Sequence, residues 1–299
     1  MSNIDLIIEE RAASIGPFMV GRLLPFRQKR MVGPFIYIDH MGPVELKGGE
    51  YFDVPPHPHI GLSTLTFLLE GSIMHRDTLG TEQEITPGAV NWMTAGKGIV
   101  HSERSPEHLR GQPLRMHGLQ IWVALPKEHE EIEPNFSHVA KNELPSWSEN
   151  GLHFRLVAGE ALGKKSPVPV YSKLFMIEIK NGAERRALHL ENKLYGEAGL
   201  YILEGSVFAH GNEYESRQIL VSNDGSLCAL ELAPNTSLYI FGGEPFPEER
   251  HIHWNFVSSN MERIEQARER WKNQEFGTIE GETDFIPMPE WPRGLRSKK

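Results

Sequence analysis

A seven-residue sequence that occurs twice constrains the fold of this chain more than any other feature. The stretch Phe67–Ile73 (FLLEGSI) recurs as Tyr201–Val207 (YILEGSV), at an offset of 134 residues. Self-similarity at a fixed spacing marks duplicated units, and a spacing this long suits a whole domain better than a solenoid repeat. The chain has 299 residues, so two related domains are expected.

Short apolar or alternating segments bounded by glycine and proline dominate the first half of the chain. Residues 62–69 and 119–123 are examples. Segments of this kind are typical of β-sandwiches and barrels, and no long helices alternate with them, which argues against a doubly wound α/β fold. One helix is predicted near the C-terminus over residues 263–273, with Ser259 and Glu262 as a capping box.

Two pairs of potential metal ligands lie in the first half of the chain, His57 with His59 and His101 with Glu103. Residues two apart in a β-strand project to the same side, and the 41 residues between His59 and His101 allow the chain to return beside its starting strand. A lone His-x-His often arises without a metal, but the second pair favours a site. Three imidazoles and one carboxylate suit a divalent ion such as iron, manganese, nickel, copper or zinc.

The duplication predicts where the second copy would carry such ligands. Adding 134 to the first pair leads to Glu191 and Lys193, and adding it to the second pair leads near Asn235 and Ser237. The second copy is therefore expected to lack the metal site. We predict that the metal chemistry belongs to the first domain.

The balance of charge and the cysteine count exclude several classes of function. The chain has 40 acidic and 31 basic residues, a net charge of −9 and no concentrated basic tract, which disfavours direct nucleic-acid binding. Its single cysteine, Cys228, excludes an intramolecular disulfide and a zinc-ribbon site, and this favours the cytoplasm. The N-terminus does not resemble a signal peptide, and no apolar run is long enough to predict a membrane span.

Several longer motifs carry a family resemblance. The chain resembles pirins, which belong to the cupin superfamily of double-stranded β-helix barrels. The motifs cover most of the first domain. Residues 243–245 and the helix that ends near Phe276 and Gly277 also resemble pirins, so the similarity spans nearly the whole chain. The matching stretches are residues 57–61 (HPHIG), 68–71 (LLEG), 75–77 (HRD), 92–103 (WMTAGKGIVHSE) and 117–123 (HGLQIWV).

This resemblance implies an all-β bicupin, with two double-stranded β-helix (jelly-roll) barrels and a short C-terminal helix. The expected division is an N-terminal metal-binding barrel over residues 1–134, a linker over 135–150, and a C-terminal barrel without metal ligands, with helix and tail, over 151–299. The resemblance also implies that His57, His59, His101 and Glu103 hold one metal, most often Fe(II).

Two functions follow from the resemblance, and the residues do not choose between them. One is a dioxygenase similar to quercetin 2,3-dioxygenase, in which Glu103 would act as the base toward a flavonol-like substrate that is cleaved with O2. The alternative is a metal- or redox-gated regulatory protein that binds a transcription factor or a metabolic enzyme. A metal-free bicupin with a structural role is the third interpretation.

Some positions near the predicted ligands depart from the family pattern, and others allow two interpretations of their role. Many pirins carry glutamate where Ser63 stands and arginine where Ile60 stands, so the substrate preference is expected to differ. His75, His117 and Gln120 lie in matching stretches. They are either groups that orient a ligand imidazole or hydrogen-bonded polar groups of the barrel.

Overall fold

The computed structural model describes residues 4–15, 18–225, 227 and 230–290; Cys228 lies outside this part of the chain. The described residues form 25 strands, two short 3-10 helices (Glu107–Leu109 and Lys127–His129) and one α-helix, α1 (Met261–Lys272). The prediction of an all-β chain with one short C-terminal helix is confirmed. None of the helices in the described part has the length and apolarity needed to cross a membrane.

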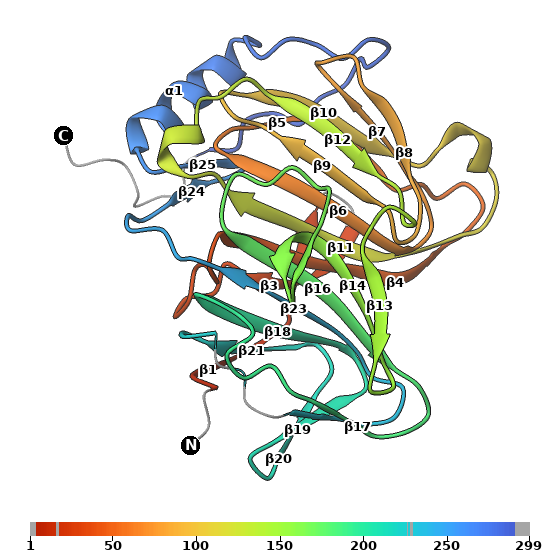
Figure 1. The fold of residues 1–299 in the computed structure, drawn as a ribbon. Helices are drawn as coiled ribbons and strands as arrows, with labels where there is room; N and C mark the ends of the chain where they lie inside the picture. Colours follow the sequence, from red (N-terminus) through yellow and green to blue (C-terminus); the bar gives the residue numbers. More distant parts are fainter. Residues whose placement is uncertain (1–3, 16–17, 226, 228–229, 291–299) are drawn as a thin grey trace.

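The N-terminal barrel combines a large sheet with a small one (Figure 1). The large sheet has the strand order β12 (Asn135–Val139), β9 (Val90–Thr94), β6 (Leu62–Glu70), β11 (Leu114–Ala124), β4 (Phe35–Leu46), β3 (Phe18–Leu24) and β2 (Arg11–Ile15). The small sheet has the order β5 (Asp53–His59), β10 (Ile99–Arg104), β7 (Ile73–Asp77) and β8 (Glu82–Ile85).

The C-terminal barrel repeats this plan. Its large sheet has the order β1 (Leu6–Glu9), β21 (Gln218–Ser222), β18 (Glu197–Glu204), β23 (Ser237–Gly243), β16 (Leu174–Asn181), β14 (Leu152–Ala161) and β13 (Ser146–Glu149), with β15 (Lys164–Lys165) beside β14. Its small sheet has the order β17 (Arg186–Leu188), β22 (Leu230–Leu232), β19 (Ser206–Ala209) and β20 (Asn212–Glu215). The repeated sequence lies at the junction of β6 and β7 and again at that of β18 and β19.

Several segments cross the predicted domain boundaries, which themselves stay a prediction. β1, at the start of the chain, pairs with β21 of the C-terminal barrel. In the predicted linker, β12 pairs with β9 of the N-terminal barrel and β13 pairs with β14 of the C-terminal barrel. Residues 135–150 are thus largely built into the two large sheets.

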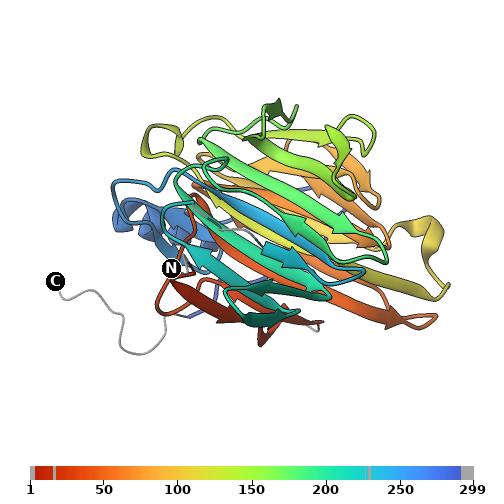
Figure 2. The ribbon, with the colours of Figure 1, turned by 60° about the horizontal axis from the view of Figure 1, so that its bottom comes forward.

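The two large sheets pack face to face and enclose the main apolar core (Figure 2). Aromatic side chains from both barrels meet there. The ring of Phe35 lies 5.1 Å from that of Phe241, and the ring of Phe67 lies 5.9 Å from that of Tyr239. Burial of so much apolar surface between the sheets holds the two barrels in one orientation.

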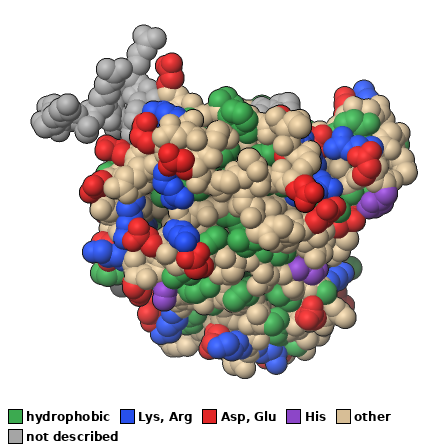
Figure 3. Space-filling model, turned by 90° about the horizontal axis from the view of Figure 1, so that it is seen from above, with side chains coloured by type: hydrophobic (Ala, Val, Ile, Leu, Met, Phe, Trp, Pro, Cys, Tyr) green, Lys and Arg blue, Asp and Glu red, His purple; other side chains and the backbone are tan. Residues whose placement is uncertain are grey.

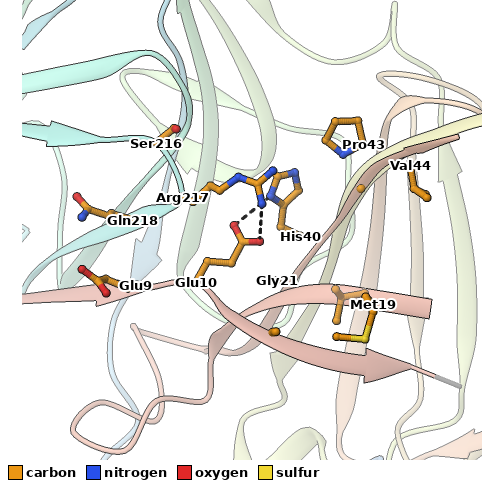
Figure 4. Close-up of a pocket in the computed structure, with 13 residues that line it drawn as sticks. Glu9, Glu10, Met19, Gly21, His40, Pro43, Val44, Ser216, Arg217 and Gln218 are labelled. Carbon is orange, nitrogen blue, oxygen red and sulfur yellow. Dashed lines mark hydrogen bonds and ion pairs between the residues drawn. The ribbon is translucent and has the colours of Figure 1, made fainter. Parts of the chain in front are cut away.

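A cluster of polar side chains closes one end of this interface. His40 contacts the Tyr201 hydroxyl through Nδ1 at 2.8 Å and His117 through Nε2 at 2.8 Å. Glu10 lies beside His40 and pairs with Arg217 at 3.2 Å, next to a surface cavity of about 640 Å³ (Figure 4). These groups satisfy one another, so the cluster fastens the barrels together.

The C-terminal segment packs on the N-terminal barrel beside a two-stranded sheet of β24 (His251–His253) and β25 (Phe256–Ser258). Ile264, Ala267 and Trp271 of α1 are buried, as predicted, whereas Met261 is exposed. The capping-box prediction is wrong. Asn260 caps the helix by accepting from Glu262 N, because the Ser259 side chain is taken up by Glu130.

Residues beyond α1 continue as an extended strap across β5 and β10 (Figure 1). Ser102 Oγ donates to Glu282 at 2.7 Å, and Arg104 Nε donates to both carboxylate oxygens of Glu282 at 2.9 and 3.0 Å. Ile286 N donates to Pro56 O at 2.9 Å. The strap therefore binds the outer side of the strands that carry the predicted ligands.

Candidate metal centre

Pairing of β5 with β10 brings the predicted histidines together. The two strands are antiparallel, with His101 opposite His57 and Ile99 opposite His59. One ring nitrogen from each histidine lies within 4.8 Å of one from each of the others. The ring centroids of His57 and His101 are 4.4 Å apart. The described residues contain one such group of three or more potential ligands.

Glu103 lies two residues farther along β10 and is not among this group of three. The register shifts between His101 and Glu103, because three steps on β5, from Val54 to His57, oppose two steps on β10. The extra residue is on β5, while β10 pairs with β7 without a shift from His101 to Arg104, so Glu103 stays on the same side of β10 as His101. The Glu103 carboxylate is buried, and Thr66 Oγ1 lies 3.1 Å from its Oε1. Its role as the fourth ligand stays a prediction.

The free ring nitrogens suit a metal ion. His57 Nδ1 lies 2.8 Å from Pro55 O, so Nδ1 carries the proton and Nε2 remains a lone-pair donor. His101 Nε2 is buried and has no hydrogen-bond partner among the described residues. A buried nitrogen without a partner is costly, and a metal would remove that cost. The three histidines therefore fit a divalent transition metal.

Burial keeps these imidazoles neutral. The four predicted ligands are between 1 and 7% exposed. Burial lowers the pKa of His57 to about 4, although the hydrogen bond to Pro55 opposes the shift. Burial, with the neighbouring histidines, also lowers the pKa of His59 and of His101 well below the usual value. Burial raises the pKa of Glu103, so its carboxylate is more basic than an exposed one.

His75 and Gln120 lie beside the site, whereas His117 does not. His75 Nδ1 is 3.4 Å from His101 Nδ1. Gln120 Oε1 is 3.0 Å from Thr66 Oγ1, whose hydroxyl also faces Glu103, and one hydroxyl proton serves one of these acceptors at a time. His117 lies instead in the polar cluster between the barrels.

The two departures from the family pattern do not contact the ligands through any hydrogen bond of the described residues. Ser63 is fully buried, and its hydroxyl lies 3.0 Å from Thr94 Oγ1. Ile60 packs with Phe256 and Trp271 in the apolar cluster under α1.

Two groups beside the proposed ligands, Asp77 and Thr66, were not predicted from the sequence. Asp77 Oδ2 lies 2.9 Å from His75 Nε2, and Thr66 contacts Glu103. The His75-x-Asp77 spacing places both residues on one side of a strand and was a usable signal. Thr66 carried none, because its contact with Glu103 joins β6 of the large sheet to β10 of the small sheet.

The second barrel has apolar residues where the first has the carboxylate. Glu103 faces Val54 across β10 and β5, and the equivalent pair across β22 and β17 is Leu230 with Leu188. Both leucines are buried. The predicted counterpart of Glu103 near Ser237 is therefore wrong, because Ser237 begins β23 and the counterpart lies earlier, in β22. The chain between the repeated sequence and this strand is shorter in the second copy.

Comparison with known proteins identifies the family. The Pirin family model matches residues 18–123, and the model of the pirin C-terminal cupin domain matches residues 175–277. A pirin-like protein of Caulobacter vibrioides is 48% identical over 293 residues, which cover 96% of this chain and 100% of that protein. The chain belongs to the pirin family. The predicted pirin bicupin fold is confirmed.

Two further relatives of this chain carry the name of an activity. A protein of Pseudomonas aeruginosa, named as a proposed quercetin 2,3-dioxygenase, is 38% identical over 95% of this chain and 90% of its own length. A crystal structure titled quercetin 2,3-dioxygenase, from Acinetobacter baumannii, superimposes with a TM-score of 0.86. It is 35% identical and covers 98% of both chains.

Proposed function

We propose that this pirin is a metal-dependent dioxygenase that cleaves the ring of a flavonol-like substrate with O2. The observation that carries the proposal is the group of three buried, neutral imidazoles, with the buried Glu103 on the strand that carries His101. Two relatives that are 35 and 38% identical and bear the name quercetin 2,3-dioxygenase support it.

In this proposal His57, His59, His101 and Glu103 hold one metal, most often Fe(II), with Mn, Ni, Cu and Zn as the other candidates. The metal would supply Lewis acidity and a partner for dioxygen at one place. The imidazoles add no charge and Glu103 adds one negative charge, so a divalent ion keeps a net positive charge that attracts an anionic substrate oxygen.

Glu103 would take the proton from the substrate 3-hydroxyl. Its raised pKa makes the carboxylate a better base near neutral pH than an exposed glutamate. Thr66 lies close enough to orient one carboxylate oxygen. The buried position of the site excludes bulk water, which favours attack on the substrate over side reactions. Cleavage of the heterocycle would insert both oxygen atoms and release carbon monoxide.

Aerobic incubation of the iron-loaded protein with quercetin tests this function. We expect loss of the flavonol absorbance together with release of carbon monoxide, faster than with the same concentration of free iron. His101→Ala, loaded in the same way, is the matched control for site-bound metal. A rate no greater than that of free iron would refute the dioxygenase proposal.

Burial of the site favours one second candidate, a protein whose metal state controls partner binding. The predicted ligands are at most 7% exposed, and four cavities of 440 to 900 Å³ are lined by other residues. A partner pull-down with wild type and His101→Ala tests it, and identical partners would argue against metal gating. On the face seen in Figure 3, basic and acidic side chains are interspersed.

Elemental analysis of protein purified without added metal tests both candidates. We expect about one transition metal ion per chain. We also propose that the protein is cytoplasmic. A trace of metal, with no uptake after iron addition, would leave a metal-free structural bicupin.

A further inference from the structure

We propose that Asp77, acting through His75, is a positioning residue that fixes which nitrogen of His101 faces the metal. This inference rests on the proposed metal site but not on the proposed substrate. It concerns a relay of three side chains, His101, His75 and Asp77, that neither the family models nor the relatives' names assign.

The strand pairing creates the relay. β7 is antiparallel to β10, with Asp77 opposite His101 and His75 opposite Glu103. His101 Nδ1 lies 3.4 Å from His75 Nδ1, and His75 Nε2 lies 2.9 Å from Asp77 Oδ2. All three side chains are buried, so water does not replace these contacts.

The Asp77 carboxylate is held in one orientation. Its Oδ1 accepts hydrogen bonds from Leu79 N at 2.9 Å and Thr81 N at 3.1 Å, within the turn that joins β7 to β8. Oδ2 is thereby directed at His75. A carboxylate in this setting is only an acceptor, so the group that faces it must donate.

The Asp77 carboxylate determines which ring nitrogen of His75 and of His101 carries the proton. His75 must carry its proton on Nε2 to donate to Asp77, which leaves a lone pair on His75 Nδ1. That lone pair favours a proton on His101 Nδ1, and the lone pair of His101 is then on Nε2. His101 Nε2 is the buried nitrogen that lacks a partner among the described residues. The relay therefore turns a lone pair toward the site.

The substitution Asp77→Asn inverts this order while keeping the shape. The amide oxygen would continue to accept from Leu79 and Thr81, so the amide nitrogen would donate to His75 Nε2. His75 would then carry its proton on Nδ1 and donate to His101, whose own proton would move to Nε2. That proton would occupy the direction in which a metal must bind.

A purely structural role for His75 is the competing explanation, because its ring stacks on Phe136 with centroids 4.6 Å apart. The variant His75→Phe keeps an aromatic ring at this place and removes both nitrogens. It breaks the relay without imposing the wrong tautomer. Asp77→Asn should therefore weaken metal binding more than His75→Phe does, and the double variant should return to the level of His75→Phe.

The experiment measures zinc affinity of the full chain by competition with a chromophoric chelator, and the histidine tautomers of the metal-free protein by long-range ¹H–¹⁵N NMR. Asp53→Asn is the control. That carboxylate also lies in the small sheet, at the start of β5, where it accepts from Ser105 N and Arg110. We expect about 10- to 100-fold weaker binding for Asp77→Asn and a small change for Asp53→Asn. The His101 proton should move from Nδ1 to Nε2 in Asp77→Asn and stay on Nδ1 in Asp53→Asn.

Unchanged tautomers in Asp77→Asn, or a double variant as weak as Asp77→Asn alone, would overturn the proposal. If Asp77→Asn does not fold, His75→Phe decides, since wild-type His101 must hold its proton on Nδ1 and lose that preference in this variant. A wild type that binds no metal would refute the metal site, yet the tautomers of the metal-free protein would still report on the relay.

Discussion

Acidification should destabilise the metal-free protein through its buried histidines. The pKa of His57 is about 4 in the folded protein, against 6.5 for an exposed imidazole. On acidification the unfolded chain therefore takes up this proton first. Its contribution to stability is fully present above about pH 6.5 and is lost as the pH falls to about 4.

The difference of about 2.5 pH units corresponds to about 3 kcal/mol of unfolding free energy for His57 alone. His57 is buried, so solvent screening does not reduce this figure much. Burial also lowers the pKa of His59 and of His101, so both add to the loss with the same sign.

Urea unfolding of the metal-free protein between pH 7.5 and 4.5 measures this effect. We expect the unfolding free energy to fall steeply below pH 6.5 in wild type and less steeply in His57→Gln, which has one titrating group fewer. His108→Gln replaces an exposed histidine and is the control. An equal slope in wild type and His57→Gln would show that His57 titrates normally and that its burial does not keep it neutral.

Three further substitutions test separate parts of the molecule. Glu103→Gln should lower kcat per bound metal by about 10²- to 10⁴-fold, measured with quercetin and corrected for metal content, and an unchanged kcat would exclude Glu103 as the base. Trp271→Ala should cost about 3 to 5 kcal/mol of unfolding free energy in urea, because the side chain is buried under α1. Tyr201→Phe removes the hydroxyl partner of His40 and should cost about 1 to 3 kcal/mol without a change in zinc affinity; weaker zinc binding would connect the two regions.

Each of the two ligand pairs was predictable from the sequence because a spacing of two is a local feature of a strand, and the resemblance to pirins implied that the pairs meet. Spacing of two in a strand places His57 beside His59, and a strand that returns places His101 opposite His57. The repeat indicated the duplication for a similar reason, since each copy keeps its own glycine turn between paired strands. At Gly71 and Gly205 the φ angles are +87° and +78°, in the left-handed region that favours glycine.

Other features depend on contacts between distant parts of the chain and left no local pattern. β1 pairs with β21 across more than two hundred residues. The strap residue Glu282 reaches Ser102 and Arg104. The helix cap moved by one residue, to Asn260, because Glu130 competes for Ser259. Tertiary pairing decided each of these cases, and local propensity did not.

The two sides of β10 connect the strap to the proposed metal site. His101 and Glu103 project into the barrel, and the intervening Ser102 and the next residue, Arg104, project to the other side, where Glu282 binds both. Because the side chains of a strand alternate rigidly, fixing one side fixes the direction of the other. The contacts of Glu282 on the outer side of β10 therefore also fix the direction of His101 and Glu103. In the second barrel the equivalent strand, β22, carries Leu230 where Glu103 stands, so an apolar side chain packs at the place of the proposed carboxylate ligand.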